Sequence, residues 1–136
     1  MLSPFRMVCG NFILPEPASY VFFYAFSNLR NLLYIIPASR PVIAAKRDNM
    51  DEYDTIFVGF PIWWYIAPII INTFLESYDL KGKTIIPFAT SGGSDMGKTN
   101  EKLAPSCPGA KLLHGKVFNS YSSKADLSAW VETLSL

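Results

Sequence analysis

The sequence predicts an α/β fold with a parallel sheet, and three observations lead to this prediction. After residue 45, short apolar segments alternate with segments of helical periodicity, as in chains where helices connect parallel strands. The first apolar segment is uninterrupted, which is typical of a strand buried on both faces. The length of 136 residues and an apolar content of 50% fit one compact domain over residues 1–136.

The first strand and the first helix are predicted over residues 54–60 and about 68–77. The strand is apolar and lies between Asp54 and Pro61. Pro68 suits the first turn of a helix, because the N–H group that proline lacks has no partner there in any case. The helix then has one apolar face, formed by Ile70, Ile71, Phe74, Leu75 and Tyr78.

The alternation continues through the second half of the chain. A polar turn leads to a second strand over residues 84–89, in which Pro87 is unusual for a central strand. A Gly/Ser loop over 91–97 precedes a short polar helix that ends before Pro105. A third strand is predicted over 111–118.

A closing helix follows the third strand. It begins at Ser123, which is placed to form a capping box with Asp126. Its apolar stripe consists of Leu127, Trp130, Val131 and Leu134. Three strands, each followed by a helix, complete the pattern of a parallel α/β sheet.

Residues 1–45 have a different composition, with four charged and eight aromatic residues. Their longest apolar stretch, over residues 18–29, falls short of the roughly 20 residues that a membrane-spanning helix needs. Arg6 and the Pro-rich segment before the stretch argue against a signal peptide. We expect a buried strand and a short helix here, or else an irregular N-terminus, and no membrane partner.

Charge and cysteine usage exclude several classes of function. The net charge of +1 gives no basic surface that would predict nucleic-acid binding. One histidine and two distant cysteines, Cys9 and Cys107, argue against a zinc site and a disulfide scaffold. A reduced, cytoplasmic setting is expected.

Two loops are candidates for a ligand site, because ligands bind parallel sheets at the carboxyl ends of the strands. The first loop, residues 60–68, contains Trp63, Trp64 and Tyr65 in succession. Such aromatic side chains either stack on a planar ring or pack under the following helix. The second loop, residues 89–97, contains adjacent glycines that let backbone N–H groups approach a ligand closely.

The second loop also matches a phosphate-binding motif. Residues 92–99 fit the P-loop pattern G-x-x-x-x-G-K-[ST] and follow a predicted strand. A P-loop opens a robust helix, however, whereas Pro105 ends the helix here within about two turns. The motif therefore does not predict a nucleoside triphosphatase.

The strand and loop segments resemble the flavodoxin family, in particular its short flavodoxin-like FMN-binding members. The resemblance covers residues 40–136 and is carried by residues 51–64, 73–79, 82–84, 87–94, 107–110 and 127–130. It implies a doubly wound parallel sheet with strand order 2-1-3-4-5 and FMN at the switch point.

The resemblance also assigns residues to the flavin. One loop would lie against one side of the flavin ring and consists of Pro61, Ile62, Trp63 and Trp64. The other would contact the polar edge of the ring with backbone and hydroxyl groups and consists of Thr90, Ser91, Gly92, Gly93 and Ser94. No side chain is assigned to catalysis and none to a metal, and His114, placed inside the third strand, is interpreted as structural.

Residues 1–39 depart from the family pattern. Ser27 and Asn31 stand in register with the loop that binds the FMN phosphate, but Arg30 stands where that loop has its glycine. Only eight residues separate Asn31 from Arg40, which is too few for a full first helix and second strand. We therefore expect a sheet that is incomplete at its N-terminal strands, a lowered affinity for FMN, and self-association, such as a homodimer, through the exposed sheet edge.

The resemblance implies an FMN-binding protein that transfers electrons, or an oxidoreductase linked to NAD(P)H or a quinone. Its partners would be a redox protein or a small quinone-type acceptor, because the flavin supplies the redox chemistry. The alternative is a truncated, cofactor-free flavodoxin-like module that acts by protein interaction.

Overall fold

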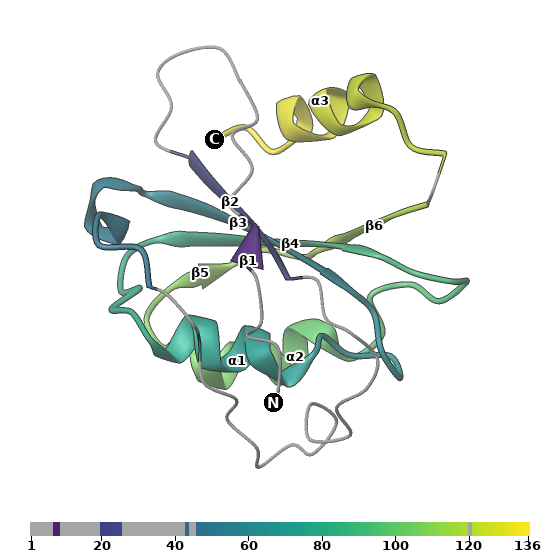
Figure 1. The fold of residues 1–136 in the computed structure, drawn as a ribbon. Coiled ribbons are helices and arrows are strands. Elements are labelled where there is room, and N and C mark those ends of the chain that lie inside the picture. The colour runs from purple at the N-terminus through teal and green to yellow at the C-terminus, as the bar shows by residue number, and fades with distance from the viewer. Residues whose placement is uncertain (1–6, 9–19, 26–42, 44–45, 120) are drawn as a thin grey trace.

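The computed structural model describes residues 7–8, 20–25, 43, 46–119 and 121–136 (Figure 1). In this part of the chain, six strands form one sheet. The α-helices lie on both faces of that sheet: α1 (Ile69–Glu76) and α2 (Thr99–Leu103) on one, and α3 (Lys124–Thr133) on the other (Figure 1). Short 3-10 turns, Met50–Glu52 and Ala104–Ser106, precede β3 and follow α2. The predicted α/β class with helices on both faces is confirmed.

The sheet is parallel except at one edge. Its strands are β1 (Met7–Val8), β2 (Tyr20–Ala25), β3 (Thr55–Pro61), β4 (Thr84–Thr90), β5 (Lys111–Leu112) and β6 (Lys116–Phe118). The order runs β1-β2-β3-β4-β5, and β6 also pairs with β4. From β2 onward this is the order that the resemblance implies. The outer position expected for the family's second strand is occupied instead by β1, which is antiparallel and comes first in the chain.

The strand expected in the apolar stretch over residues 18–29 is present as β2, parallel to β3. The helix expected beside it falls on residues outside those that the structure describes. The same is true of Ser27 and Asn31, the predicted remnants of the phosphate loop.

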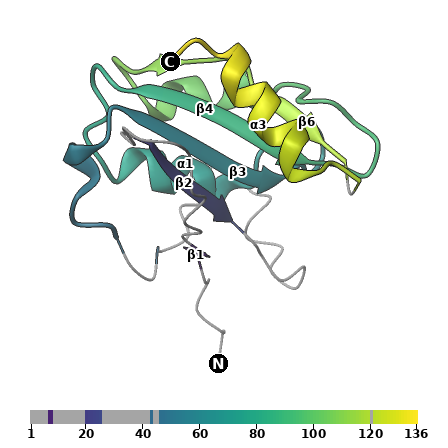
Figure 2. The same cartoon turned by 90° about the horizontal axis from the view of Figure 1, so that it is seen from above.

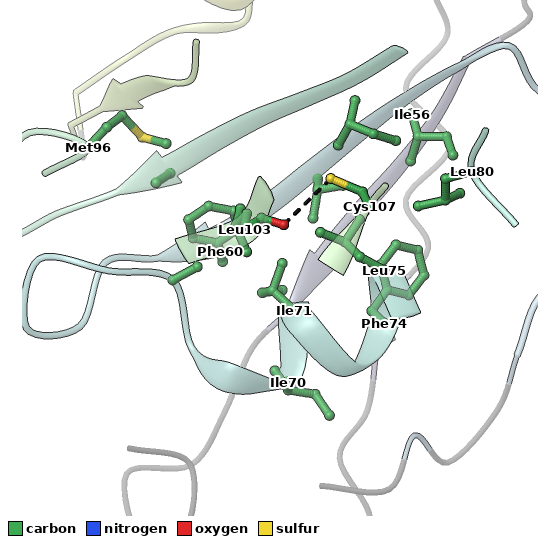
Figure 3. Close-up of a cluster of buried hydrophobic side chains, with 14 of the residues drawn as sticks. Ile56, Phe60, Ile70, Ile71, Phe74, Leu75, Leu80, Met96, Leu103 and Cys107 are labelled. Atoms are coloured by element: carbon green, nitrogen blue, oxygen red, sulfur yellow. Dashed lines mark hydrogen bonds between the residues drawn. The ribbon is translucent and has the colours of Figure 1, made fainter. Parts of the chain in front are cut away.

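The main core lies between the sheet and the face covered by α1 and α2. Alternate residues of β3, Ile56, Val58 and Phe60, are fully buried on this side, whereas Phe57 belongs to the cluster under α3. Ile70, Ile71, Phe74 and Leu75 of α1 pack against these residues in the same core (Figure 3). A central strand that is buried on both faces explains the continuous apolar run in the sequence.

The third predicted strand is divided into β5 and β6, and Pro87 of β4 explains the division. Leu113 donates its N–H to Ile85 O at 2.9 Å, so odd-numbered residues of β4 face β5 and β6. Pro87 lies on that same side and has no N–H to offer. The pairing accordingly stops after Leu112 and resumes at Lys116. His114 lies in this gap rather than in a strand, which corrects its predicted placement.

The closing helix α3 forms as predicted and crosses over β4 and β6 when viewed from above (Figure 2). Ser123 and Asp126 form the predicted capping box. Trp130 is buried, with its ring center 6.0 Å from that of Phe57 and 5.2 Å from that of Phe118. Among the described residues, no helix is both long enough and apolar enough to cross a membrane.

Candidate functional site

The two candidate loops leave neighbouring strands at the carboxyl edge of the sheet. Pro61 at the end of β3 pairs with Thr90 at the end of β4, and Ile62 donates its N–H to Thr90 O at 2.8 Å. Pro61 and Ile62 are half-buried, and Ile62 packs against the main core. The fold therefore brings together the two groups of residues that were predicted to hold a ligand.

Residues 63–66 form a tight two-residue turn, which we call the aromatic turn. Trp63 and Ile66 exchange both backbone hydrogen bonds, at 2.9 and 3.1 Å, and enclose Trp64 and Tyr65. Trp64 and Tyr65 have φ values of 51° and 67°, which is the geometry of a type I′ turn. Such turns favour Asn-Gly, because positive φ costs other L-residues about 1–2 kcal/mol each. The aromatic turn is thus a strained segment.

The strained turn also exposes large aromatic surfaces. The side chain of Trp64 is 78% exposed and that of Tyr65 is 64% exposed, whereas Trp63 is half-buried. Trp64 therefore does not pack under α1, which was the alternative explanation for this group of aromatics. Strain together with exposed aromatic surface is characteristic of a binding site rather than of a core.

The second loop begins with a turn that satisfies its own polar groups, which we call the serine turn (residues 91–94). Ser91 Oγ accepts hydrogen bonds from the N–H groups of Gly93 at 3.2 Å and Ser94 at 2.9 Å, and it lies 2.8 Å from Ser94 Oγ. Two of the N–H groups predicted to reach a ligand are therefore used inside the loop. The Ser91–Ser94 hydroxyl pair and the exposed Thr90 are the side-chain oxygens that this loop places at the edge of the sheet.

The glycines of the serine turn leave room for close approach. Apart from the glycine itself and its two chain neighbours, no described residue has an atom within 4 Å of the position that a Cβ would take on Gly92 or Gly93. A planar ring can therefore reach this backbone without displacing a side chain. An exposed indole on one loop and an open, hydroxyl-bearing backbone on the other fit the aromatic and polar parts of a flavin ring.

The P-loop interpretation is not supported by the surroundings of Thr99. A P-loop places this hydroxyl on magnesium, but Thr99 is 0% exposed and its Oγ1 has no hydrogen-bond partner among the described residues. Helix α2, which would have to hold the phosphates, is only five residues long. Over the described ranges there is also no cluster of three potential metal ligands.

Cys107 does not add a reactive group to the site, and His114 lies outside the two candidate loops. Cys107 lies in the main core, where its thiol is directed toward Leu103 O at 3.5 Å (Figure 3). Burial raises the pKa of this thiol, so it stays protonated and unreactive at neutral pH. His114 is exposed, and its Nδ1 lies 2.9 Å from Gly115 O.

One exposed residue at the same edge was not predicted from the sequence. Tyr121, in the connection from β6 to α3, is 91% exposed, and its N–H donates to Asn119 Oδ1 at 2.9 Å. It lies three residues after the end of β6, and this position could have predicted it as a site residue. The resemblance assigns residues only to the loops after β3 and β4.

Comparison with known proteins identifies the family. The flavodoxin family model matches residues 33–134. The chain is also similar to solved structures of two putative flavoproteins. For the one from Bacteroides eggerthii, the identity is 40% and the TM-score 0.67, over 74% of this chain and 63% of that one. For the one from Bacteroides uniformis, the identity is 44% and the TM-score 0.65, over 71% and 62%.

This chain thus spans less than two thirds of the length of either structure. No match was found among curated proteins. The family match nevertheless covers most of the chain and includes β3, β4 and both candidate loops. The chain belongs to the flavodoxin family.

Proposed function

We propose that this chain binds FMN between the aromatic turn and the serine turn and serves in electron transfer, or in an oxidoreductase reaction linked to NAD(P)H or a quinone. The observation that carries the proposal is the strained, 78% exposed Trp64 at the carboxyl edge of a flavodoxin-family sheet. An indole held in water is costly, and an aromatic ligand that stacks on it removes that cost.

Each group at the edge has a distinct part in this proposal. Trp64 stacks on one face of the ring, while Pro61 and Ile62 fix the start of its loop against the core. Thr90 and the Ser91–Ser94 hydroxyl pair bind the polar edge of the ring. The bound flavin supplies the redox chemistry, so no side chain needs to act as acid or base.

The phosphate end of FMN contributes less than in a typical family member. The segment that would bind it has Ser27 in register but Arg30 in place of glycine. A single arginine does not reproduce a nest of backbone N–H groups. We therefore expect FMN and riboflavin to bind with similar affinity, because both present the same ring to the aromatic turn.

A flavin titration tests the proposal. Purified protein is titrated with FMN and with riboflavin, and quenching of flavin fluorescence reports binding. Trp64→Ala should raise both dissociation constants about tenfold, because a stacked aromatic pair contributes about 0.5–1.5 kcal/mol beyond its buried area. Trp64→Phe is the matched control, since it keeps an aromatic face, and should stay within about threefold of the parent.

Two results would count against this function. If Trp64→Ala binds flavin as tightly as the parent protein, the ring does not stack on the aromatic turn. If the parent protein binds neither flavin, the chain is a cofactor-free flavodoxin-like module, and its exposed aromatic turn then serves another purpose.

A further inference from the structure

The aromatic turn adopts a conformation that its own residues disfavour, so something outside the turn must hold it. We infer that residues 96–98, which we call the brace, position the aromatic turn for flavin stacking, and that Gly97 is the positioning residue. This inference rests on the proposed flavin site. It assigns a role to the second half of the loop after β4, beyond the serine turn.

The brace contacts the strained turn directly. Lys98 donates its N–H to Tyr65 O at 3.1 Å, which ties the second central residue of the turn to the start of α2. Tyr65 O belongs to the peptide group that follows the strained φ of that residue. The hydrogen bond therefore favours the observed orientation of this peptide over the alternatives.

Only glycine fits at position 97. Its φ is +49°, in the region that L-residues with a side chain rarely adopt. A Cβ at this position would stand 2.6 Å from Tyr65 O and 3.0 Å from Tyr65 Cβ. Because one of these atoms is backbone, the turn itself would have to move to make room.

The brace is anchored in the core at its other end. Met96 is 5% exposed and belongs to the main core, and its Sδ and Cε lie beside Gly115 (Figure 3 shows Met96 at one end of that core). A Cβ on Gly115 would overlap Met96 Cε and stand 3.0 Å from Pro87 O. The gap between β5 and β6 therefore accommodates Met96, and Met96 fixes the brace against β4.

These contacts connect Pro87 with Trp64 through a series of neighbouring residues. Pro87 interrupts the pairing of the third strand, the gap receives Met96, and Gly97 and Lys98 hold Tyr65. Trp64 directly precedes Tyr65 in the turn. Gly97 therefore acts on the flavin ring through the aromatic turn and needs no contact with the flavin.

The test compares Gly97→Ala with Gly82→Ala. Gly82 also has a positive φ, +79°, but no described residue other than its chain neighbours has an atom within 4 Å of the position of its Cβ. Both variants thus place an alanine at a positive φ. Only in Gly97→Ala would the new Cβ clash with Tyr65. Amide hydrogen exchange in the flavin-free protein reports the hydrogen bonds of Trp63, Ile66 and Lys98. Titration with riboflavin reports ring stacking.

We expect Gly97→Ala to accelerate exchange of these three amides about tenfold and to weaken riboflavin binding about tenfold, each equivalent to about 1.4 kcal/mol. Gly82→Ala should leave both measurements within about twofold of the parent. Unchanged riboflavin binding in Gly97→Ala, or an equal loss in Gly82→Ala, would overturn the inference.

If Gly97→Ala does not fold, amide exchange in the parent protein tests the inference instead. Its Lys98 amide should exchange at the same rate as those of Trp63 and Ile66, because the brace and the turn open together. If the Lys98 amide is unprotected while the amides of the turn are protected, the brace does not hold the aromatic turn. Since exchange is measured without flavin, a parent protein that binds no flavin refutes the proposed function but not the contact between the brace and the turn.

Discussion

The two edges of the sheet are built in opposite ways. At the amino edge, before β3 and β4, polar side chains bind one another and the backbone. Arg47 donates to Asn49 Oδ1 at 2.8 Å and to Tyr53 OH at 2.7 Å. Lys83 Nζ donates to the backbone O of Tyr53 at 2.7 Å. At the carboxyl edge, Trp64 and Tyr121 are largely exposed and the backbone of the aromatic turn is strained. The amino edge is stabilised by its own hydrogen bonds, whereas the carboxyl edge leaves aromatic side chains exposed, as the proposed flavin site requires.

We therefore expect the amino edge to contribute to stability and the aromatic turn to contribute to flavin binding. Substitutions at the amino edge should lower the free energy of unfolding and leave flavin affinity unchanged. Substitutions in the aromatic turn should change flavin affinity and leave the free energy of unfolding unchanged or raised, because strained residues at functional sites do not contribute to stability. Each prediction below tests one side of this division.

The largest effect is expected from Phe74→Ala. Phe74 is fully buried, and its ring center lies 5.2 Å from that of Tyr78, whose hydroxyl accepts the N–H of Arg47 at 2.8 Å. The variant should lose about 3–5 kcal/mol of unfolding free energy, measured by urea denaturation, or fail to fold. A loss below about 1 kcal/mol would show that the core relaxes around the cavity and that the amino edge does not depend on it.

Arg47→Ala should have the next largest effect. The guanidinium donates to Asn49 Oδ1 and Tyr53 OH, and it lies over the Tyr53 ring, 5.1 Å from its center. Charged hydrogen bonds of this kind are worth about 1.5–3 kcal/mol, and we expect a loss in this range by urea denaturation. Lys46→Ala is the neighbouring control and should cost less than about 0.5 kcal/mol, because Lys46 is exposed. Equal losses in both variants would mean that general charge, rather than these contacts, stabilises the amino edge.

Tyr65→Gly should instead stabilise the protein. Glycine adopts the φ of 67° at this position without the steric cost that tyrosine has, so the free energy of unfolding should rise by about 1 kcal/mol. Tyr121→Gly makes the same replacement in another exposed loop residue, where positive φ is not required, and should not stabilise. A destabilised Tyr65→Gly would show that the tyrosine side chain contributes more than its backbone strain costs.

The sequence predicted those parts of the fold that are set by local pattern. The apolar run of β3, the apolar face of α1 and the capping box of Ser123 with Asp126 can each be recognised within a few residues. The division of the third strand could not be predicted, because it depends on which side of β4 Pro87 faces. That side follows from the register between strands, as the hydrogen bond from Leu113 to Ile85 shows.

The candidate site shows the same limit. The positions of both loops could be predicted, since they follow from the rule that ligands bind at the carboxyl ends of parallel strands. The aromatic turn could not, because Trp64 and Tyr65 are poor residues for a type I′ turn. Its conformation is explained by Gly97 and Lys98, more than 30 residues later in the chain.

The smallest predicted effect concerns the start of α3, which also lies at the carboxyl edge but is unstrained. The N–H and hydroxyl of Ser123 donate to Asp126 Oδ2 at 2.7 and 2.8 Å and hold the pKa of this carboxyl below its usual range, with a weaker contribution from Lys116. The unfolded chain therefore binds the proton more readily. The stabilisation is present above the unfolded pKa of about 4 and is lost as the pH falls through the lower folded value.

Urea denaturation from pH 5 downward should show this loss in the parent protein and a shallower one in Asp126→Asn, which has no proton to bind at this position. An NMR titration of the Asp126 carboxyl provides the direct check, and a pKa at or above that of an unfolded peptide would contradict the prediction. Since Asp126 is exposed, the effect should be smaller than that of Tyr65→Gly. Confirmation would show that the start of α3 contributes to stability, in contrast to the strained aromatic turn at the same edge.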